Sequence, residues 1–136
     1  MLAPRPALVV VVWEAGAAYE MMELPSSAGG VPAAPIDIRT AAEVDRMLYE
    51  RAQRLAQHGA ALAGEAGFEA EGLAVADEVT VADTLVRLAR ERDAQALVVG
   101  AHGHSRLREA LLGSTSRGVL SHAECPVLVV REPEGS

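Results

Sequence analysis

Apolar residues along the chain fall into short continuous runs and into longer stretches with helical spacing. Residues 7–13 read ALVVVVW and residues 96–99 read ALVV. Continuous, largely β-branched runs of this kind are typical of strands that are buried on both faces of a parallel sheet. Residues 68–76 alternate apolar and acidic side chains, which indicates an edge strand. Pro126 opens a last run, PVLVVR, so the pattern predicts four strands.

Stretches with helical periodicity separate these runs. The first begins at Thr40, which has capping-box spacing to Glu43, and extends to residue 66, where Gly64 and Gly67 end it. A second helix follows Thr80, and a third reaches about His122. In the first helix the spacing predicts one buried apolar stripe, formed by Val44, Met47, Leu48, Leu55 and Leu62.

The elements alternate in the order β-α-β-α-β-α-β, which favours parallel pairing through right-handed crossovers. The expected fold class is α/β: an open, doubly wound parallel sheet of four strands in the order 2-1-3-4, with three main helices. We expect residues 1–136 to form a single domain, with a long loop at 15–39 and a polar tail at 132–136.

The composition excludes several classes of function. The chain has 136 residues, 12 basic and 19 acidic, for a formal net charge of -7. An acidic chain lacks the basic face that neutralises phosphates, so we expect no nucleic-acid partner. Every basic residue other than histidine is an arginine, which excludes a lysine-containing phosphate loop of Walker type. The single cysteine, Cys125, excludes an intramolecular disulfide and a cysteine-cluster zinc site.

Membrane, metal and catalytic roles are also disfavoured. No apolar run approaches the ~20 residues that span a bilayer, so we expect a cytoplasmic protein with no membrane partner. His102 and His104 form an HxH pair, but no acidic or cysteine ligand lies at a convincing spacing, and we predict no metal site. We assign no catalytic residue, because no nucleophile elbow surrounds Ser114.

The chemistry that the sequence does offer follows the strand at 96–99. Ligands of open parallel sheets bind beyond the carboxyl ends of the strands. Gly100 and Gly103 allow the backbone to approach a ligand closely. Ser114–Ser116 are expected to begin the last helix, where free backbone N–H groups and the helix dipole favour an anion. Hydroxyl groups and nearby arginines, including Arg106, would complete a phosphate cradle without lysine.

The run VVGAHGHSRLREALLGSTSRGVLSHAECPVLVVR resembles the C-terminal half of the universal stress protein A family. Nucleotide-binding members carry a G-x2-G-x9-G-[ST] motif, and Gly100, Gly103, Gly113 and Ser114 match it at every spacing. The resemblance implies a Rossmann-like, adenine nucleotide alpha hydrolase-like domain that binds an adenine nucleotide. It also implies a homodimer, and the last strand, Val127–Val130, is the expected contact.

The N-terminal half departs from the family pattern. Residues 8–14, LVVVVWE, resemble the second strand of the family, so the first strand, its helix and the aspartate that faces the nucleotide have no match. By its match to the second-strand valine, Val12 is expected to contact adenine. Three arrangements stay open: direct pairing of residues 7–13 with 96–99, a gap filled by a partner molecule, or a segment encoded upstream of Met1.

The function expected from these observations is binding of ATP or a related adenine nucleotide, accompanied by Mg²⁺ where a divalent ion is present, by a regulator of the stress response. Any hydrolysis should be slow, since no general base is placed and lysine is absent. One alternative is an interaction protein of the same fold without nucleotide, and a weaker one is a slow nucleotide hydrolase that uses His102 or His104. The predicted nucleotide contacts are Val12, Gly100, His102, Gly103, Arg106, Gly113, Ser114, Thr115 and Ser116.

Overall fold

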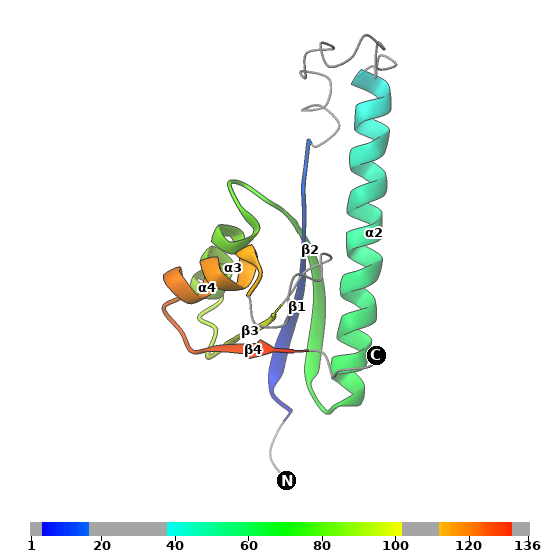
Figure 1. Cartoon of the computed structure of the whole chain (residues 1–136). Helices are drawn as coiled ribbons and strands as arrows, with labels where there is room; N and C mark the ends of the chain where they lie inside the picture. The colour runs from blue at the N-terminus through cyan, green and yellow to red at the C-terminus, as the bar shows by residue number, and fades with distance from the viewer. Residues whose placement is uncertain (1–3, 17–37, 102–111, 132–136) are drawn as a thin grey trace. The chain divides into compact units, whose positions relative to one another are not determined.

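The computed structural model describes residues 4–16, 38–101 and 112–131, and the chain divides into two compact units between Asp77 and Glu78. The first unit contains β1 (Pro6–Trp13), α2 (Ile38–Glu65) and β2 (Glu69–Ala76) (Figure 1). The second contains α3 (Val81–Glu91), β3 (Leu97–Gly100), α4 (Ser114–His122) and β4 (Val127–Val130). The described elements follow the predicted alternation of strands and helices, and the α/β class is confirmed.

In the first unit, β1 and β2 form a parallel ladder that runs from Pro6 opposite Glu69 to Trp13 opposite Ala76. The long helix α2 connects the two strands and packs along both of them (Figure 1). A parallel pair needs such a crossover because the chain must return to the same end of the sheet before the second strand begins. The predicted strands at 7–13 and 68–76 are confirmed to within one residue.

Helix α2 begins at Ile38, so Thr40 lies inside the helix and is not its N-cap. The predicted stripe is also wrong in part. Met47, Leu55 and Leu62 are 65%, 53% and 52% exposed, whereas Val44 and Leu48 are half-buried. The residues that α2 does bury are all small: Ala41, Ala52 and Ala56.

Close approach of α2 to the strands explains why small residues are buried. A Cβ atom added at Gly72 of β2 would lie 2.6 Å from the carbonyl oxygen of Ala56. One added at Gly59 of α2 would lie 2.7 Å from Cγ1 of Val9. Leucine or methionine side chains do not fit where two backbones approach this closely, which is consistent with the exposure of Met47, Leu55 and Leu62.

Two carboxylates hold the turn that follows β1. The backbone N–H of Gly16 donates to both carboxylate oxygens of Asp45, at 3.0 and 3.1 Å. The N–H of Ala15 donates to Oδ1 of Asp77 at 3.3 Å. Gly16 has φ +81°, a left-handed conformation that glycine adopts without the steric cost of a Cβ. The carboxyl end of β1 is therefore fixed to both α2 and the end of β2.

In the second unit, β3 and β4 pair in parallel, with Leu97 opposite Val127 and Gly100 opposite Val130. Both strands alternate between half-buried and exposed positions. Leu97 and Val99 of β3 and Val127 of β4 pack against a core formed by Val119, Ala82 and Val86 from the two helices. The core of this unit therefore lies between one face of the β3–β4 ladder and the helices α3 and α4.

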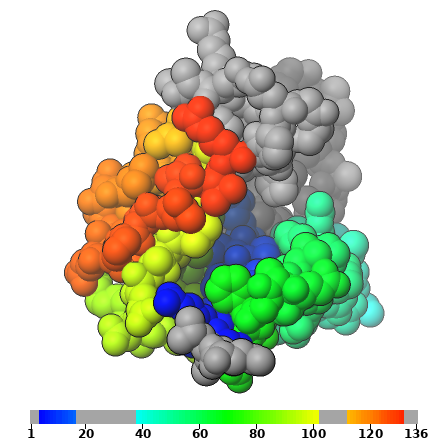
Figure 2. Space-filling model, turned by 90° about the horizontal axis from the view of Figure 1, so that it is seen from below, coloured from blue at the N-terminus to red at the C-terminus, as the bar shows by residue number. Residues whose placement is uncertain are grey.

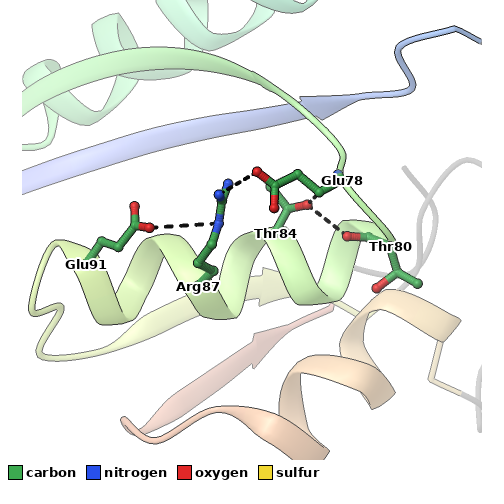
Figure 3. A network of polar contacts seen from close by, with 5 residues as sticks. All are labelled: Glu78, Thr80, Thr84, Arg87 and Glu91. Carbon is green, nitrogen blue, oxygen red and sulfur yellow. Dashed lines mark hydrogen bonds and ion pairs between the residues drawn. The ribbon is translucent and has the colours of Figure 1, made fainter.

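Thr80 caps α3, as its spacing to Asp83 predicts. Its Oγ1 accepts a hydrogen bond from the backbone N–H of Asp83 at 3.0 Å. The hydroxyl of Thr84, which is buried, donates to the carbonyl oxygen of Thr80 at 2.9 Å (Figure 3). Nη1 of Arg87 also contacts Oε1 of Glu78 at 2.6 Å. These contacts fix the start of the helix whose inner face forms the core.

Two of the three neighbour relations in the predicted order 2-1-3-4 are observed, β2 with β1 and β3 with β4. The pairing of β1 with β3 and the single domain over residues 1–136 stay predictions. The predicted loop at 15–39 and tail at 132–136 lie largely outside the described residues. Within the described ranges, no helix combines the length and apolar character needed to cross a bilayer.

Candidate functional site: the start of helix α4

The site predicted after β3 centres on Ala101, the first residue beyond the strand. Its backbone N–H donates to the carbonyl oxygen of Val130 at 2.8 Å, which extends the β3–β4 ladder by one bond. Its own carbonyl oxygen accepts from the N–H of Gly113 at 2.8 Å. Ala101 is buried, so it joins the end of β3, the end of β4 and the start of α4.

Helix α4 begins without a side-chain cap. Its N-cap residue is Gly113, in an extended conformation with φ -65° and ψ 165°, and no side-chain hydrogen bond caps the helix. The first intrahelical bond is donated by the N–H of Arg117 to the carbonyl oxygen of Gly113, at 3.1 Å. The N–H groups of Ser114, Thr115 and Ser116 therefore have no acceptor within the helix.

These three N–H groups lie at the positive end of the helix dipole, which favours a bound anion. The first turn contains no acidic residue that would oppose a negative ligand. Arg117, which is exposed, adds positive charge in the same turn. The described part of the site can therefore donate several hydrogen bonds to an anionic group such as a phosphate.

The three consecutive hydroxyl residues do not share one environment. Ser114 is exposed and Thr115 is half-buried, whereas Ser116 is only 1% exposed. The hydroxyl of Ser116 donates toward the carbonyl oxygens of Gly113 and Ala101, at 3.0 and 3.3 Å. Successive helical residues point about 100° apart, so one hydroxyl faces solvent while another faces the interior.

The structure brings together five of the nine predicted contacts, Gly100, Gly113 and Ser114–Ser116, all in the second unit. Val12 lies in β1 of the first unit, opposite Val75 in the ladder. The remaining three, His102, Gly103 and Arg106, lie outside the described residues. In the part of the chain that is described, no group of three or more His, Cys, Asp or Glu residues is arranged to hold a metal ion.

Sequence reasoning missed Ala101. Its contribution comes from its backbone N–H and carbonyl groups and from its burial, and an alanine side chain gives no sign of either. The one available signal was its position directly after Gly100, where the strand ends and the backbone of a parallel sheet turns toward the next element.

These features define the class of protein: a parallel α/β protein in which a helix with a glycine N-cap follows the carboxyl end of a strand. The sequence profile described as the universal stress protein family matches residues 25–131. The chain belongs to the universal stress protein family. Family and fold together support a stress-related role of the universal stress protein type.

Individual relatives agree with this assignment. Universal stress protein Rv2623 of Mycobacterium tuberculosis is 31% identical over 104 residues, which cover 76% of this chain and 33% of the relative. Universal stress protein YxiE of Bacillus subtilis is 32% identical over 89 residues, 65% of this chain and 59% of the relative. Universal stress protein MJ0531 of Methanocaldococcus jannaschii is 40% identical over 53 residues, 39% of this chain and 31% of the relative. The matched segment thus spans about a third of the length of two of these relatives.

The same fold occurs in solved structures. The structure of the hypothetical protein MJ0577 superposes on this chain with a TM-score of 0.74 and 19% sequence identity. The match covers 99% of this chain and 81% of the MJ0577 chain. MJ0577 is a universal stress protein of Methanocaldococcus jannaschii. At this level of identity the likeness concerns the fold.

Proposed function

We propose that the chain binds an adenine nucleotide, with the phosphates at the start of α4, and acts as a nucleotide-dependent regulator in the stress response. The observation that carries the proposal is the uncapped helix start. Three consecutive N–H groups without intrahelical acceptors, at Ser114–Ser116, follow a glycine N-cap. The match of Gly100, Gly103, Gly113 and Ser114 to the family's nucleotide-binding motif supports phosphate as the anion.

A helix that served only as structure would gain stability from a side-chain cap. Serine, threonine or aspartate at the N-cap satisfies one free N–H group, which contributes about 1 kcal/mol relative to alanine and about a few tenths of a kcal/mol relative to glycine. Helix α3 has such a cap in Thr80. Helix α4 has Gly113 instead, which leaves the N–H groups available to an external acceptor. The contrast between the two helices of one unit supports a ligand at α4.

The other parts of the nucleotide are assigned by the family resemblance. In this proposal Val12 lines the adenine pocket, while His102, Gly103 and Arg106 contact ribose and phosphates. Mg²⁺ would accompany the phosphates, which together with water supply the oxygen ligands it prefers. The described residues of the chain would then bind and orient the nucleotide through backbone N–H groups and the hydroxyls of Ser114 and Thr115.

Proline at position 114 tests the contribution of one N–H group. Gly113 already has the extended conformation that precedes proline, and proline is favoured at the first helical position, where its fixed φ suits the helix. We expect Ser114→Pro to preserve α4 while removing one N–H donor. A hydrogen bond to a charged group contributes about 1.5–3 kcal/mol, so the affinity for ATP should fall at least about tenfold.

The measurement is isothermal titration calorimetry with ATP and Mg²⁺, with adenosine as the ligand that lacks phosphates. Ser114→Ala is the matched control, because it removes the hydroxyl and keeps the N–H, and its loss of affinity should be smaller. Equal affinities of the two variants would contradict a role for this N–H group. Absence of heat with ATP for the unmodified chain would contradict nucleotide binding and favour an interaction protein without nucleotide.

We further propose that two copies of the chain associate through β4. This strand pairs only with β3 among the described strands, and its other edge exposes backbone groups that can extend the ladder. Leu128 and Val130 are 60% and 49% exposed, and in Figure 2 the orange-red atoms of this part of the chain lie open at the surface. An apolar edge of this kind is commonly covered by a symmetric copy.

Light scattering coupled to size-exclusion chromatography tests the association. We expect the mass of two chains at micromolar concentration. Leu128→Lys should shift the mass toward one chain, because a charge on this edge opposes pairing. A single-chain mass for the unmodified protein at high micromolar concentration would contradict the dimer.

A further inference from the structure

We propose that Ser116 is the positioning residue of the phosphate site: its hydroxyl holds the end of β3 against the start of α4 and does not itself contact the ligand. The proposal rests on the proposed function, since it assigns a role within the same site. It replaces the expectation that the hydroxyls of Ser114, Thr115 and Ser116 all face the phosphates.

The hydroxyl proton of Ser116 is already used in hydrogen bonds within the protein and is not available to a ligand. A serine hydroxyl carries one proton. That proton points toward two carbonyl oxygens, those of Gly113 at 3.0 Å and Ala101 at 3.3 Å. With Ser116 only 1% exposed, a phosphate oxygen would have to reach a buried atom and displace both carbonyl groups. The hydroxyl is therefore committed to the protein.

The second of these contacts spans the site. Ser116 and Ala101 are separated by 15 positions, so this bond joins the end of β3 to the first turn of α4. The carbonyl oxygen of Ala101 already accepts from the N–H of Gly113 at 2.8 Å. The Ser116 hydroxyl fills its second acceptor position, so Ala101 is bonded to two residues of the first turn of α4.

These two bonds to the Ala101 carbonyl fix the orientation of the first turn of α4 as well as its distance from the end of β3. With a single bond, from Gly113, the end of β3 would hold the first turn of α4 at one point only, and the orientation of that turn would depend on the packing of Val119 further along the helix. A second bond from Ser116, three residues further along the helix, fixes that orientation. The N–H groups of Ser114 and Thr115 then keep one orientation relative to Gly100, the first glycine of the motif. Preorganised donors bind an anion more tightly than donors that must first be ordered.

Ser116→Ala tests the attachment without unfolding the site. The Ala101 carbonyl keeps its bond from Gly113, and the Gly113 carbonyl keeps its bond from Arg117, so no buried acceptor is left without a donor. In the absence of nucleotide, we expect the Gly113 amide hydrogen to exchange about fivefold faster than in the unmodified chain, measured by NMR. We also expect the affinity for ATP to fall by a similar factor, with adenosine binding unchanged.

Two further variants separate positioning from contact. Ser116→Thr should retain both slow exchange and affinity, because it keeps a hydroxyl on the same Cβ to donate to the Ala101 carbonyl. Ser114→Ala should leave the exchange of Gly113 unchanged in the free protein.

Each other outcome overturns the assignment. Weaker ATP binding with unchanged exchange of Gly113 would show that the Ser116 hydroxyl contacts the ligand directly. Faster exchange with unchanged affinity would limit Ser116 to a structural role, and no change in either would remove it from the site. Absence of ATP binding by the unmodified chain overturns the proposed function, and with it the phosphate role of Ser116. The exchange of Gly113 then decides separately whether the hydroxyl holds the two elements together.

Discussion

Replacement of Val119 by aspartate is expected to destabilise the second unit by at least about 4 kcal/mol, because it places an unpaired carboxylate in the core. Val119 is 0% exposed and packs with Ala82 and Val86 of α3. The substitution also removes the apolar side chain that joins the two helices. Domains are stable by about 5–15 kcal/mol, so the loss is a large part of the total stability.

Urea denaturation followed by far-UV circular dichroism measures this loss, because α3 and α4 are the helices that unfold. Leu120→Asp is the matched control: it adds the same charge one residue further along, where the side chain is 46% exposed. The control should cost about 1 kcal/mol or less. Nucleotide affinity should follow stability in Val119→Asp, since α4 carries the proposed phosphate contacts. Similar midpoints for the two variants would contradict the assigned core.

The strands and the start of α4 are the features that the sequence predicted best. Short continuous runs of β-branched residues are typical of buried strands. Both β1 and β3 lie where such runs occur in the sequence. Helix α4 begins at Ser114, where the family spacing from Gly100 requires it. Local chemistry also sufficed at Thr80, because an N-cap is a contact between residues three positions apart.

The different environments of the three hydroxyl residues at the start of α4 could not be predicted from the sequence. In the sequence, three consecutive hydroxyl residues look like three equivalent hydrogen-bond donors. Their roles differ because α4 has one rotation relative to β3, which places Ser116 against Ala101 and leaves Ser114 outside. That rotation depends on packing between elements far apart in the chain, and no local pattern records it.

The carboxylates at the end of β1 illustrate the same limit. Asp45 binds the N–H of Gly16 across 29 positions, and Asp77 binds that of Ala15 across 62. An aspartate in a helix or after a strand is ordinarily a solvent-facing residue. Only the crossover geometry of β1, α2 and β2 brings these two carboxylates to one turn.

The prediction of the buried face of α2 was wrong in part, because it placed the large apolar side chains of the helix against the strands. The helix lies so close to the strands that glycine and alanine form the contact, with Gly72 against the backbone of Ala56 and Gly59 against Val9. Glycine within a strand does signal close approach of another backbone. Gly72 in the strand and Gly59 in the helix were therefore the residues of the sequence that could have corrected the orientation of the helix.

We accordingly expect Gly72→Ala to destabilise the first unit by about 3 kcal/mol, the upper end of the usual cost of overpacking. The new Cβ would lie 2.6 Å from the carbonyl oxygen and 2.7 Å from the carbonyl carbon of Ala56, against 3.4–4 Å in ordinary contact. Both atoms belong to the backbone of α2, so no side chain can turn away. The helix itself must move, and the contacts of Gly59 with Val9 must loosen with it.

Trp13, the single tryptophan, reports this change directly, because its ring lies 5.8 Å from that of Tyr49 of α2. Its fluorescence during urea denaturation gives the midpoint of the unit that contains the substitution. Gly64→Ala is the control with the opposite expected sign: no atom lies within 4 Å of the added Cβ, and alanine favours a helix by about 0.5–1 kcal/mol over glycine. If both variants shift the midpoint upward, α2 does not rest on Gly72, and the close packing that selects its small residues is refuted.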